Sequence, residues 1–262
     1  MKRYDAVIFD LYGTLVDIHT DESRPALWRT MAAYYARKGA AYTPGELRGA
    51  YLRGVKERLA AQGGSWPEID VLAVFSDLFT AAGSAPESET IWAAAQLFRK
   101  GSTTHLRAYA GAAELTAALR RDGRRVLLLS NAQRCFTEPE LEAVGLSDSF
   151  DGIYISSDYG FQKPDPRFFQ LLLSREGLRP GQCLMVGNDP LCDAAGAKAV
   201  GMDAWYVRSG LSPRDAPPTE AVEADYRQHG TDLRALRRAL LSGRQPSQKS
   251  ESKPRSALVF TG

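Results

Sequence analysis

Five short apolar runs dominate the sequence and constrain its fold more than any other feature. Each run is four to six residues long and has the length and composition of a buried strand. The five are Tyr4–Phe9, Arg125–Leu129, Gly152–Ile155, Cys183–Val186 and Ala204–Val207. Helical patterns lie between the later runs, at Ala112–Arg121, Arg167–Leu173 and Leu191–Val200. Strands that alternate with helices predict an α/β fold, in which helices cover both faces of a parallel sheet.

The alternation is interrupted once, directly after the first strand. The long stretch before Arg125 contains four further helical patterns, separated by the helix stops Gly39, Gly63-Gly64 and Gly83. These patterns cover Ala26–Arg37, Pro44–Ala61, Pro67–Ala82 and Glu87–Arg99. We therefore expect a core formed by residues 1–16 and 106–240. Residues 17–105 should form a helical domain inserted into one loop of that core, which we call the cap.

Composition and charge exclude several classes of protein. The chain has 262 residues, 44% of them hydrophobic, and a net charge of +2. A disordered protein would have fewer hydrophobic residues and a larger net charge. Its three cysteines are too few for a disulfide scaffold. No run approaches the ~18 consecutive apolar residues of a membrane helix, and the N-terminus lacks the pattern of a signal peptide. We expect a soluble, cytoplasmic protein that acts on a small molecule, and a homodimer is compatible with the sequence.

The excess positive charge lies in residues 241–262. This segment has one acidic residue, Glu251, against the basic residues Arg244, Lys249, Lys253 and Arg255. It is also rich in Ser, Gln and Pro, so we predict a disordered basic tail. The rest of the chain is close to neutral and has no basic patch of the kind that binds nucleic acid.

Polar side chains follow four of the predicted strands at the point where each strand ends. They are Asp10, Tyr12, Gly13 and Thr14 after the first strand, Ser130 and Asn131 after the second, Lys163 after the third, and Asn188, Asp189 and Asp193 after the fourth. The carboxyl ends of parallel strands meet at one edge of a sheet, where ligands bind in open α/β folds. A single such residue is most simply a turn or helix cap, but four sets in register indicate a functional site.

These four segments resemble the four motifs of the haloacid dehalogenase-like hydrolase superfamily. Phe9–Asp17 resembles the first motif, Ser130-Asn131 the second, Lys163–Pro166 the third and Gly187–Ala197 the fourth. The position of the insert, just after the first motif, is similar to that of the helical (C1-type) cap in the phosphatase-like branch. The resemblance implies a Rossmann-like parallel-sheet core with an inserted four-helix cap.

Asp10 is the expected nucleophile of the implied reaction. A carboxylate that attacks a phosphoryl group forms a covalent aspartyl-phosphate intermediate and so divides one difficult step into two. Attack on an anionic group meets charge repulsion, which a divalent cation and a lysine relieve. Lys163 supplies the lysine, and the Pro-Asp-Pro that follows it restricts the loop.

Further residues suit the binding of phosphate oxygens. The hydroxyls of Thr14 and Ser130, and the backbone N–H of the turn at Gly13, are expected to donate hydrogen bonds to them. Asn131 is expected to orient the nucleophile or a substrate oxygen, although an Asn in a tight turn is an equally good explanation of this residue.

A bound metal ion is the simplest way to offset the negative charge of the predicted carboxylates. Asp10, Asp189 and Asp193 would raise one another's pKa values and oppose ionisation unless a cation lay between them. An all-oxygen site with few charged ligands suits Mg²⁺. The resemblance adds the backbone carbonyl of Tyr12 as a ligand, and it leaves open whether Asn188 or Asp189 contacts the metal.

Tyr12 departs from the pattern of phosphatases in this family, which usually carry an Asp there as general acid. A phenol with an ordinary pKa near ~10 is a poor proton donor to the leaving group. One interpretation is a metal-independent 2-haloacid dehalogenase, in which halide leaves unprotonated; another is a phosphatase that is slow or favours good leaving groups. Asp189 and Asp193 resemble the metal-binding form of the motif and favour the phosphatase. A binding or regulatory protein with little activity would not need Asp10, Lys163 and both loop carboxylates.

The cap is expected to close over the site and to contribute specificity. His19 and Arg24, which follow the first motif closely, are the best candidates for substrate contacts. Trp28 lies on an apolar helical stripe and is better explained as part of the core of the cap.

The interpretation of Tyr12 predicts a dependence on the leaving group. The substitution Tyr12→Asp should restore a general acid and speed the hydrolysis of an alkyl phosphate by about 10²-fold, while the rate for an aryl phosphate barely changes. Steady-state rates on the two substrates test this. Equal effects on both would contradict it.

Overall fold

The computed structural model describes residues 1–242, and the sheet at its centre confirms the predicted α/β class. Six parallel strands lie in the order β5-β4-β1-β6-β7-β8. Their bounds are β1 Ala6–Phe9, β4 Arg125–Ser130, β5 Gly152–Ile155, β6 Cys183–Gly187, β7 Asp203–Arg208 and β8 Tyr226–His229. Strands β1, β4, β5, β6 and β7 match the predicted strands, because each is a short apolar run within the sheet.

Two hydrophobic clusters sandwich the sheet. Val7 and Phe9 of β1 face one cluster, and Ala6 and Ile8 face the other, as expected from the alternation of side chains along a strand. Helices α5 (Ala112–Arg121), α6 (Arg134–Ala143) and α9 (Leu233–Ser242) contribute to the first cluster. Helix α7 (Pro166–Glu176), the π-helical turn η4 (Pro190–Ala195) and α8 (Gly196–Ala199) contribute to the second. Short 3-10 turns lie at Ser147–Ser149, Ser156–Asp158, Pro180–Gln182 and Thr219–Ala221.

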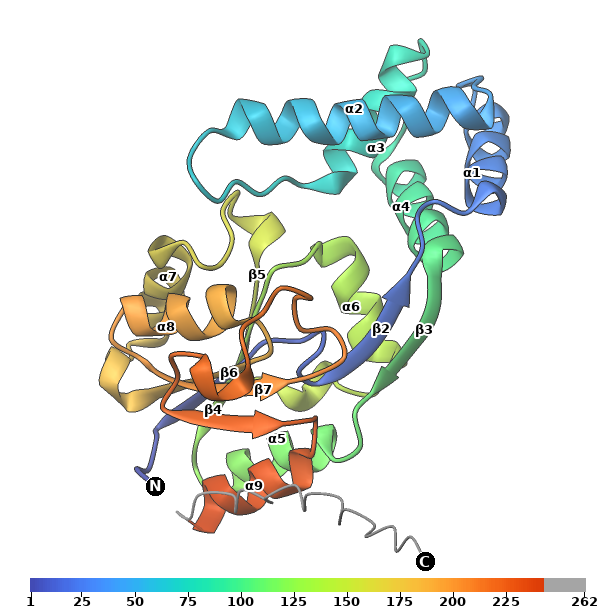
Figure 1. Ribbon diagram of the computed structural model, residues 1–262. Helices are drawn as coiled ribbons and strands as arrows, with labels where there is room; N and C mark the ends of the chain where they lie inside the picture. The colour runs from blue at the N-terminus through green and yellow to red at the C-terminus, as the bar shows by residue number, and fades with distance from the viewer. Residues whose placement is uncertain (243–262) are drawn as a thin grey trace, which may run out of the picture.

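Four helices form a separate layer beyond one edge of the sheet (Figure 1). They are α1 (Pro25–Arg37), α2 (Pro44–Gln62), α3 (Val71–Ala81) and α4 (Ser88–Ser102). Their apolar faces share a hydrophobic cluster in which Trp28, Phe75 and Phe98 are buried, so Trp28 is a core residue as expected. Cys135 and Phe136 of α6 complete that cluster, which ties the four helices to the sheet domain.

A two-stranded antiparallel ribbon joins this layer to the sheet. It consists of β2 (Val16–Thr20) and β3 (Thr103–Ala108), with a register irregularity between His19 and Thr20. Strand β2 leads into the predicted insert and strand β3 leads out of it, and the two strands are hydrogen-bonded to each other (Figure 1). We propose that residues 17–105 act as one cap and that the ribbon is its stem.

Several elements were not predicted, and some predicted bounds differ. The ribbon, α6, β8 and α9 are additional; α6 contains Pro139, and the ribbon and β8 are largely polar. The third cap helix begins at Val71 rather than Pro67, and the segment predicted at Leu191–Val200 divides into η4 and α8. Helix α9 includes Leu241 and Ser242, which we assigned to the tail. The remainder of the predicted tail, 243–262, lies outside the described residues.

Within residues 1–242, no helix is both long enough and apolar enough to cross a membrane.

The packing of the central strands predicts a large effect of truncating them. Leu128 of β4 is fully buried, so Leu128→Ala should lower the free energy of unfolding by about 2–5 kcal/mol. Leu52 on α2 is 49% exposed, and Leu52→Ala should change it by less than about 1 kcal/mol. Urea unfolding of the two variants measures the contrast. Similar losses would mean that the sheet core is not the main source of stability.

Candidate active site

The carboxyl edge of the sheet gathers the polar residues that follow β1, β4, β5 and β6. Asp10 follows β1, Ser130 ends β4, Lys163 lies beyond β5, and Asn188 follows β6. All four side chains are buried or nearly so. The structure therefore brings together residues from all four motifs.

Lys163 lies at the centre of this cluster. Its Nζ is 2.9 Å from Asp10 Oδ1 and 2.6 Å from Asp193 Oδ1, and the residue is only 2% exposed. Burial alone would lower the pKa of the Lys163 ammonium, but the carboxylates of Asp10 and Asp193 raise it above its usual value. Burial in turn raises the pKa of the Asp193 carboxyl, against the opposing charge of Lys163. Lys163 therefore remains a cation that points at Asp10.

Thr14 connects Asp10 to the fourth motif. Its hydroxyl lies 3.2 Å from Asp10 Oδ2 and 3.3 Å from Asn188 Oδ1 and can donate to either. The turn that carries Thr14 depends on Gly13, which has a φ of +85° and lies against Asn188. The Gly13 N–H donates to Val16 O inside this turn, and binding of a phosphate oxygen by other N–H groups of the turn stays a prediction.

Asn131 and Ser130 differ in their partners. The Asn131 amide donates to Lys163 O at 2.9 Å and accepts from Lys163 N at 2.8 Å, so it fixes the backbone of the lysine. The Ser130 hydroxyl is buried and has no hydrogen-bond partner within residues 1–242. A buried hydroxyl without a partner is unfavourable, and a ligand oxygen in the site would satisfy it.

The geometry distinguishes the candidate metal ligands after β6. The Asp189 carboxylate accepts hydrogen bonds from Leu191 N and Cys192 N, both at 2.8 Å, and so caps the turn η4. Asn188, by contrast, shares the Thr14 hydroxyl with Asp10. The Asn188 amide oxygen is thus joined to Asp10 through one hydroxyl, whereas the Asp193 carboxylate accepts hydrogen bonds from the Lys163 ammonium and from Asp189 N. No group of three or more His, Cys, Asp and Glu side chains among residues 1–242 has the arrangement of a metal site by itself.

Tyr12 does not direct its hydroxyl at the nucleophile. The hydroxyl donates to the Glu140 carboxylate of α6 and lies 3.2 Å from Thr137 Oγ1. Burial and the charge of Glu140 raise the pKa of the Tyr12 hydroxyl above its ordinary value, which makes it a still weaker acid. Because Tyr12→Asp would also deprive Glu140 of this donor, Tyr12→Phe is the appropriate companion variant.

A cavity of about 410 Å³ lies between the cap and the sheet domain, next to the site. Tyr12, Asn131 and Gln162 line it from the sheet side, each within two residues of a predicted catalytic residue. From the cap, its lining includes Glu22 and Arg99. The position and size of the cavity suit the organic part of a small substrate.

The two cap residues predicted to contact substrate do not line this cavity. His19 lies on the ribbon 3.8 Å from Asp17, and Arg24 donates to Gly101 O at 3.3 Å. Sequence reasoning instead missed Arg99, which pairs with Glu140 across the cap and α6. No pattern distinguishes Arg99 from Lys100, the other basic residue of α4, so only the tertiary structure could identify it.

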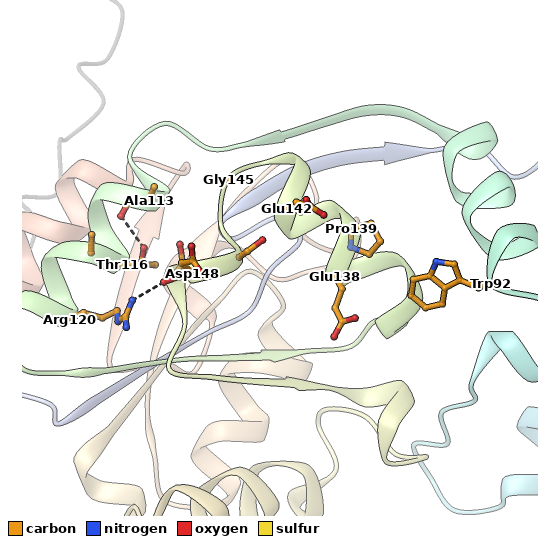
Figure 2. Close-up of a pocket in the computed structure, with 12 residues that line it drawn as sticks. Trp92, Ala113, Thr116, Arg120, Glu138, Pro139, Glu142, Gly145 and Asp148 are labelled. Atoms are coloured by element: carbon orange, nitrogen blue, oxygen red, sulfur yellow. Dashed lines mark hydrogen bonds between the residues drawn. The ribbon is translucent and has the colours of Figure 1, made fainter. Parts of the chain in front are cut away.

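A larger groove of about 860 Å³ lies elsewhere, on the outer side of α5 and α6 (Figure 2). Trp92 of α4 borders it at one end and Arg120 of α5 at the other, where Arg120 donates to Asp148 O. No predicted site residue lines this groove. Its size alone does not make it the active site, because the reactive groups lie at the carboxyl edge of the sheet.

The chain is similar in sequence to several known proteins. A family model for haloacid dehalogenase-like hydrolase matches residues 4–201. The phosphoserine phosphatase of Thermus thermophilus is 36% identical over 159 residues, which are 61% of this chain and 61% of that protein. The chain thus spans about three fifths of that relative. The glyceraldehyde 3-phosphate phosphatase of Pyrococcus furiosus is 27% identical over 80% of this chain and 83% of its own length.

Solved structures show the same architecture. A 2-haloacid dehalogenase from Pseudomonas syringae pv. Tomato DC3000 superposes with a TM-score of 0.62, over 92% of this chain and 99% of that one. At 20% sequence identity the likeness shows a shared fold.

The close approach of Asp193 to β6 predicts that a side chain at position 187 destabilises the protein. A Cβ on Gly187 would lie 2.2 Å from Asp193 Cγ, so Gly187→Ala must displace the carboxylate that holds Lys163. We expect a loss of about 1–3 kcal/mol in the free energy of unfolding. Gly181→Ala is the control, because a Cβ there meets nothing within 4 Å. Chemical denaturation of both measures the difference, and equal stability would contradict the close contact.

Proposed function

The chain belongs to the haloacid dehalogenase-like hydrolase family, and from that premise we propose that it is a Mg²⁺-dependent phosphomonoester hydrolase. Its substrate would be a small phosphorylated metabolite. Two relatives named as phosphatases support this proposal. The observation that carries it is the Asp10 carboxylate, which lies 2.9 Å from the buried ammonium of Lys163 at the carboxyl edge of the sheet.

The reaction would begin with attack by a carboxylate oxygen of Asp10 on phosphorus. The new O–P bond forms as the bond from phosphorus to the substrate oxygen breaks, and the leaving group departs with that electron pair. Water then attacks the phosphorus of the aspartyl-phosphate, which releases inorganic phosphate and restores the carboxylate of Asp10. Lys163, Thr14 and Ser130 would bind the phosphate oxygens, with Asn131 positioning Lys163 through its backbone.

The donor set beside Asp10 fits a Mg²⁺ ion. Asp10 and the Asn188 amide oxygen, with the Tyr12 carbonyl, would hold the ion, and oxygen ligands of this type suit it. The ion would neutralise charge between the carboxylate and the phosphoryl group. Asp193 would act through Lys163, and Asp189 through the turn it caps.

The leaving group would depart without a strong general acid, since the Tyr12 hydroxyl is bound to Glu140. This supports a preference for substrates with good leaving groups. The same tyrosine, together with a neutral Asn188 beside Asp10, also favours the metal-independent 2-haloacid dehalogenase as second candidate. In that reaction a carboxylate oxygen of Asp10 would displace halide from carbon, and water would hydrolyse the resulting ester.

One set of assays separates the two candidates. Asp10→Asn should lower the hydrolysis of p-nitrophenyl phosphate by about 10³-fold or more, because the nucleophile is lost. Removal of metal by EDTA should abolish the activity of the unchanged protein, and added Mg²⁺ should restore it. Asp215→Asn, at an exposed aspartate outside the site, should leave the rate unchanged.

The contrary outcomes are equally clear. Turnover of 2-chloropropionate in EDTA would establish the dehalogenase in place of the phosphatase. Phosphatase activity that survives Asp10→Asn would exclude Asp10 as the nucleophile.

A further inference from the structure

The charges that line the cavity of about 410 Å³ do not balance. Its lining includes three charged residues, the carboxylates Glu22 and Glu68 and the guanidinium of Arg99. Whether the wall favours a positive or a negative substrate group depends on which of these charges is already neutralised inside the protein.

The charge of Arg99 is already compensated. Its Nε lies 2.5 Å from Glu140 Oε1 and its Nη2 lies 3.2 Å from Glu140 Oε2, which is a two-point ion pair. The guanidinium also lies over the rings of Tyr12 and Phe136, with 5.8 Å and 5.1 Å to the ring centroids. Arg99 is thus fixed between the cap and α6, and its pairing with Glu140 leaves little net positive charge for a ligand.

Neither of the two carboxylates of the lining forms an ion pair with a cation in the part of the chain that the structure describes. Glu68 accepts hydrogen bonds from neutral donors, namely the Ser156 hydroxyl, the Gln133 amide and Ile69 N. Burial raises the pKa of the Glu68 carboxyl, and these hydrogen bonds oppose that rise by favouring the carboxylate. Glu22 lies at the exposed rim, and its carboxylate makes no hydrogen bond or ion pair with any other residue in the range 1–242. Burial raises the pKa of the Glu22 carboxyl, whereas the charge of Arg99 lowers it.

We propose that the cavity selects phosphomonoesters whose organic part carries a positively charged amine, and that Glu22 is the residue that recognises it. This inference rests on the proposed phosphatase function. The wall beyond the phosphate site is net negative, so it attracts an ammonium group and repels a second anionic group. Glu22 carries the recognition because its carboxylate is not already used within the protein and can accept hydrogen bonds from an ammonium.

Three two-carbon phosphates of similar size provide the test. They are 2-aminoethyl phosphate, 2-hydroxyethyl phosphate and phosphoglycolate, whose organic parts are cationic, neutral and anionic at neutral pH. We expect kcat/KM to fall in that order, by roughly tenfold from the first to the last. The amine should be favoured mainly through a lower KM, because it is bound outside the reacting atoms.

Glu22→Gln keeps the size of the side chain and removes its charge, so it should reduce the preference for the amine by at least about threefold. Glu57→Gln is the matched control, since Glu57 is an exposed glutamate on cap helix α2 that does not line the cavity. Each preference is a ratio measured within one variant, so a general loss of stability or activity does not alter it. Raising the salt concentration should also weaken the preference of the unchanged protein.

The outcomes separate this inference from the proposed function. If p-nitrophenyl phosphate is hydrolysed but phosphoglycolate is preferred, or if Glu22→Gln leaves the ratio unchanged, amine recognition by Glu22 is wrong and the phosphatase stands. If no phosphate ester is hydrolysed, the proposed function fails. Calorimetric binding of the three compounds to the Asp10→Asn protein then still tests the inference, because charge selection requires the same order in Kd.

Discussion

The rest of the site depends on one buried interaction, the contact of the Lys163 ammonium with Asp10 and Asp193. The lysine side chain is 1% exposed, and a charge so far from water is tolerated only with charged partners in direct contact. Because Asp10 follows β1 and Asp193 follows β6, this ion triad joins three segments that are distant in sequence. The absence of a side chain at Gly187 lets Asp193 approach closely enough to take part. The contacts that would position Asp10 as the proposed nucleophile therefore also hold this edge of the sheet together.

Much of the sheet could be predicted because its signal is local. A strand buried on both faces must be apolar along its length, and β1, β4, β5, β6 and β7 are short apolar runs of this kind. The ribbon β2–β3 could not be predicted from the same signal. Its strands are rich in polar residues and are more than eighty residues apart in sequence, for example Ile18 and Leu106. Only the tertiary fold of the intervening residues brings the two strands together.

The residues of the candidate site likewise include some that the sequence predicts and others that it does not. Residues at strand ends, such as Asp10, Lys163 and Asp193, were predictable because the topology of a parallel sheet places them at one edge. The roles of side chains that depend on tertiary contacts were not. Nothing in the local sequence indicates that Asp189 caps a turn while Asn188 adjoins Thr14, or that the Gly13 N–H is used inside its own turn. The pair formed by Arg99 and Glu140 is of the same kind, because its members come from two domains of the chain.

Two neutral side chains, Asn188 and Tyr12, stand at positions near Asp10 where a carboxylate would add negative charge to the proposed phosphate site. Asn188 places an amide beside Asp10, and the hydroxyl of Tyr12 binds a carboxylate, Glu140, outside the reacting centre. Asp10 and Asp193 share the single ammonium of Lys163, so in the proposed reaction a phosphoryl dianion would still meet negative charge at Asp10. In the proposed reaction one divalent cation would offset that charge, and its affinity should be modest because one of its ligands would be neutral. The acidic charge of Glu22 and Glu68 lies along the cavity wall, where in the proposed reaction it would influence which substrate binds rather than whether the phosphoryl group is attacked.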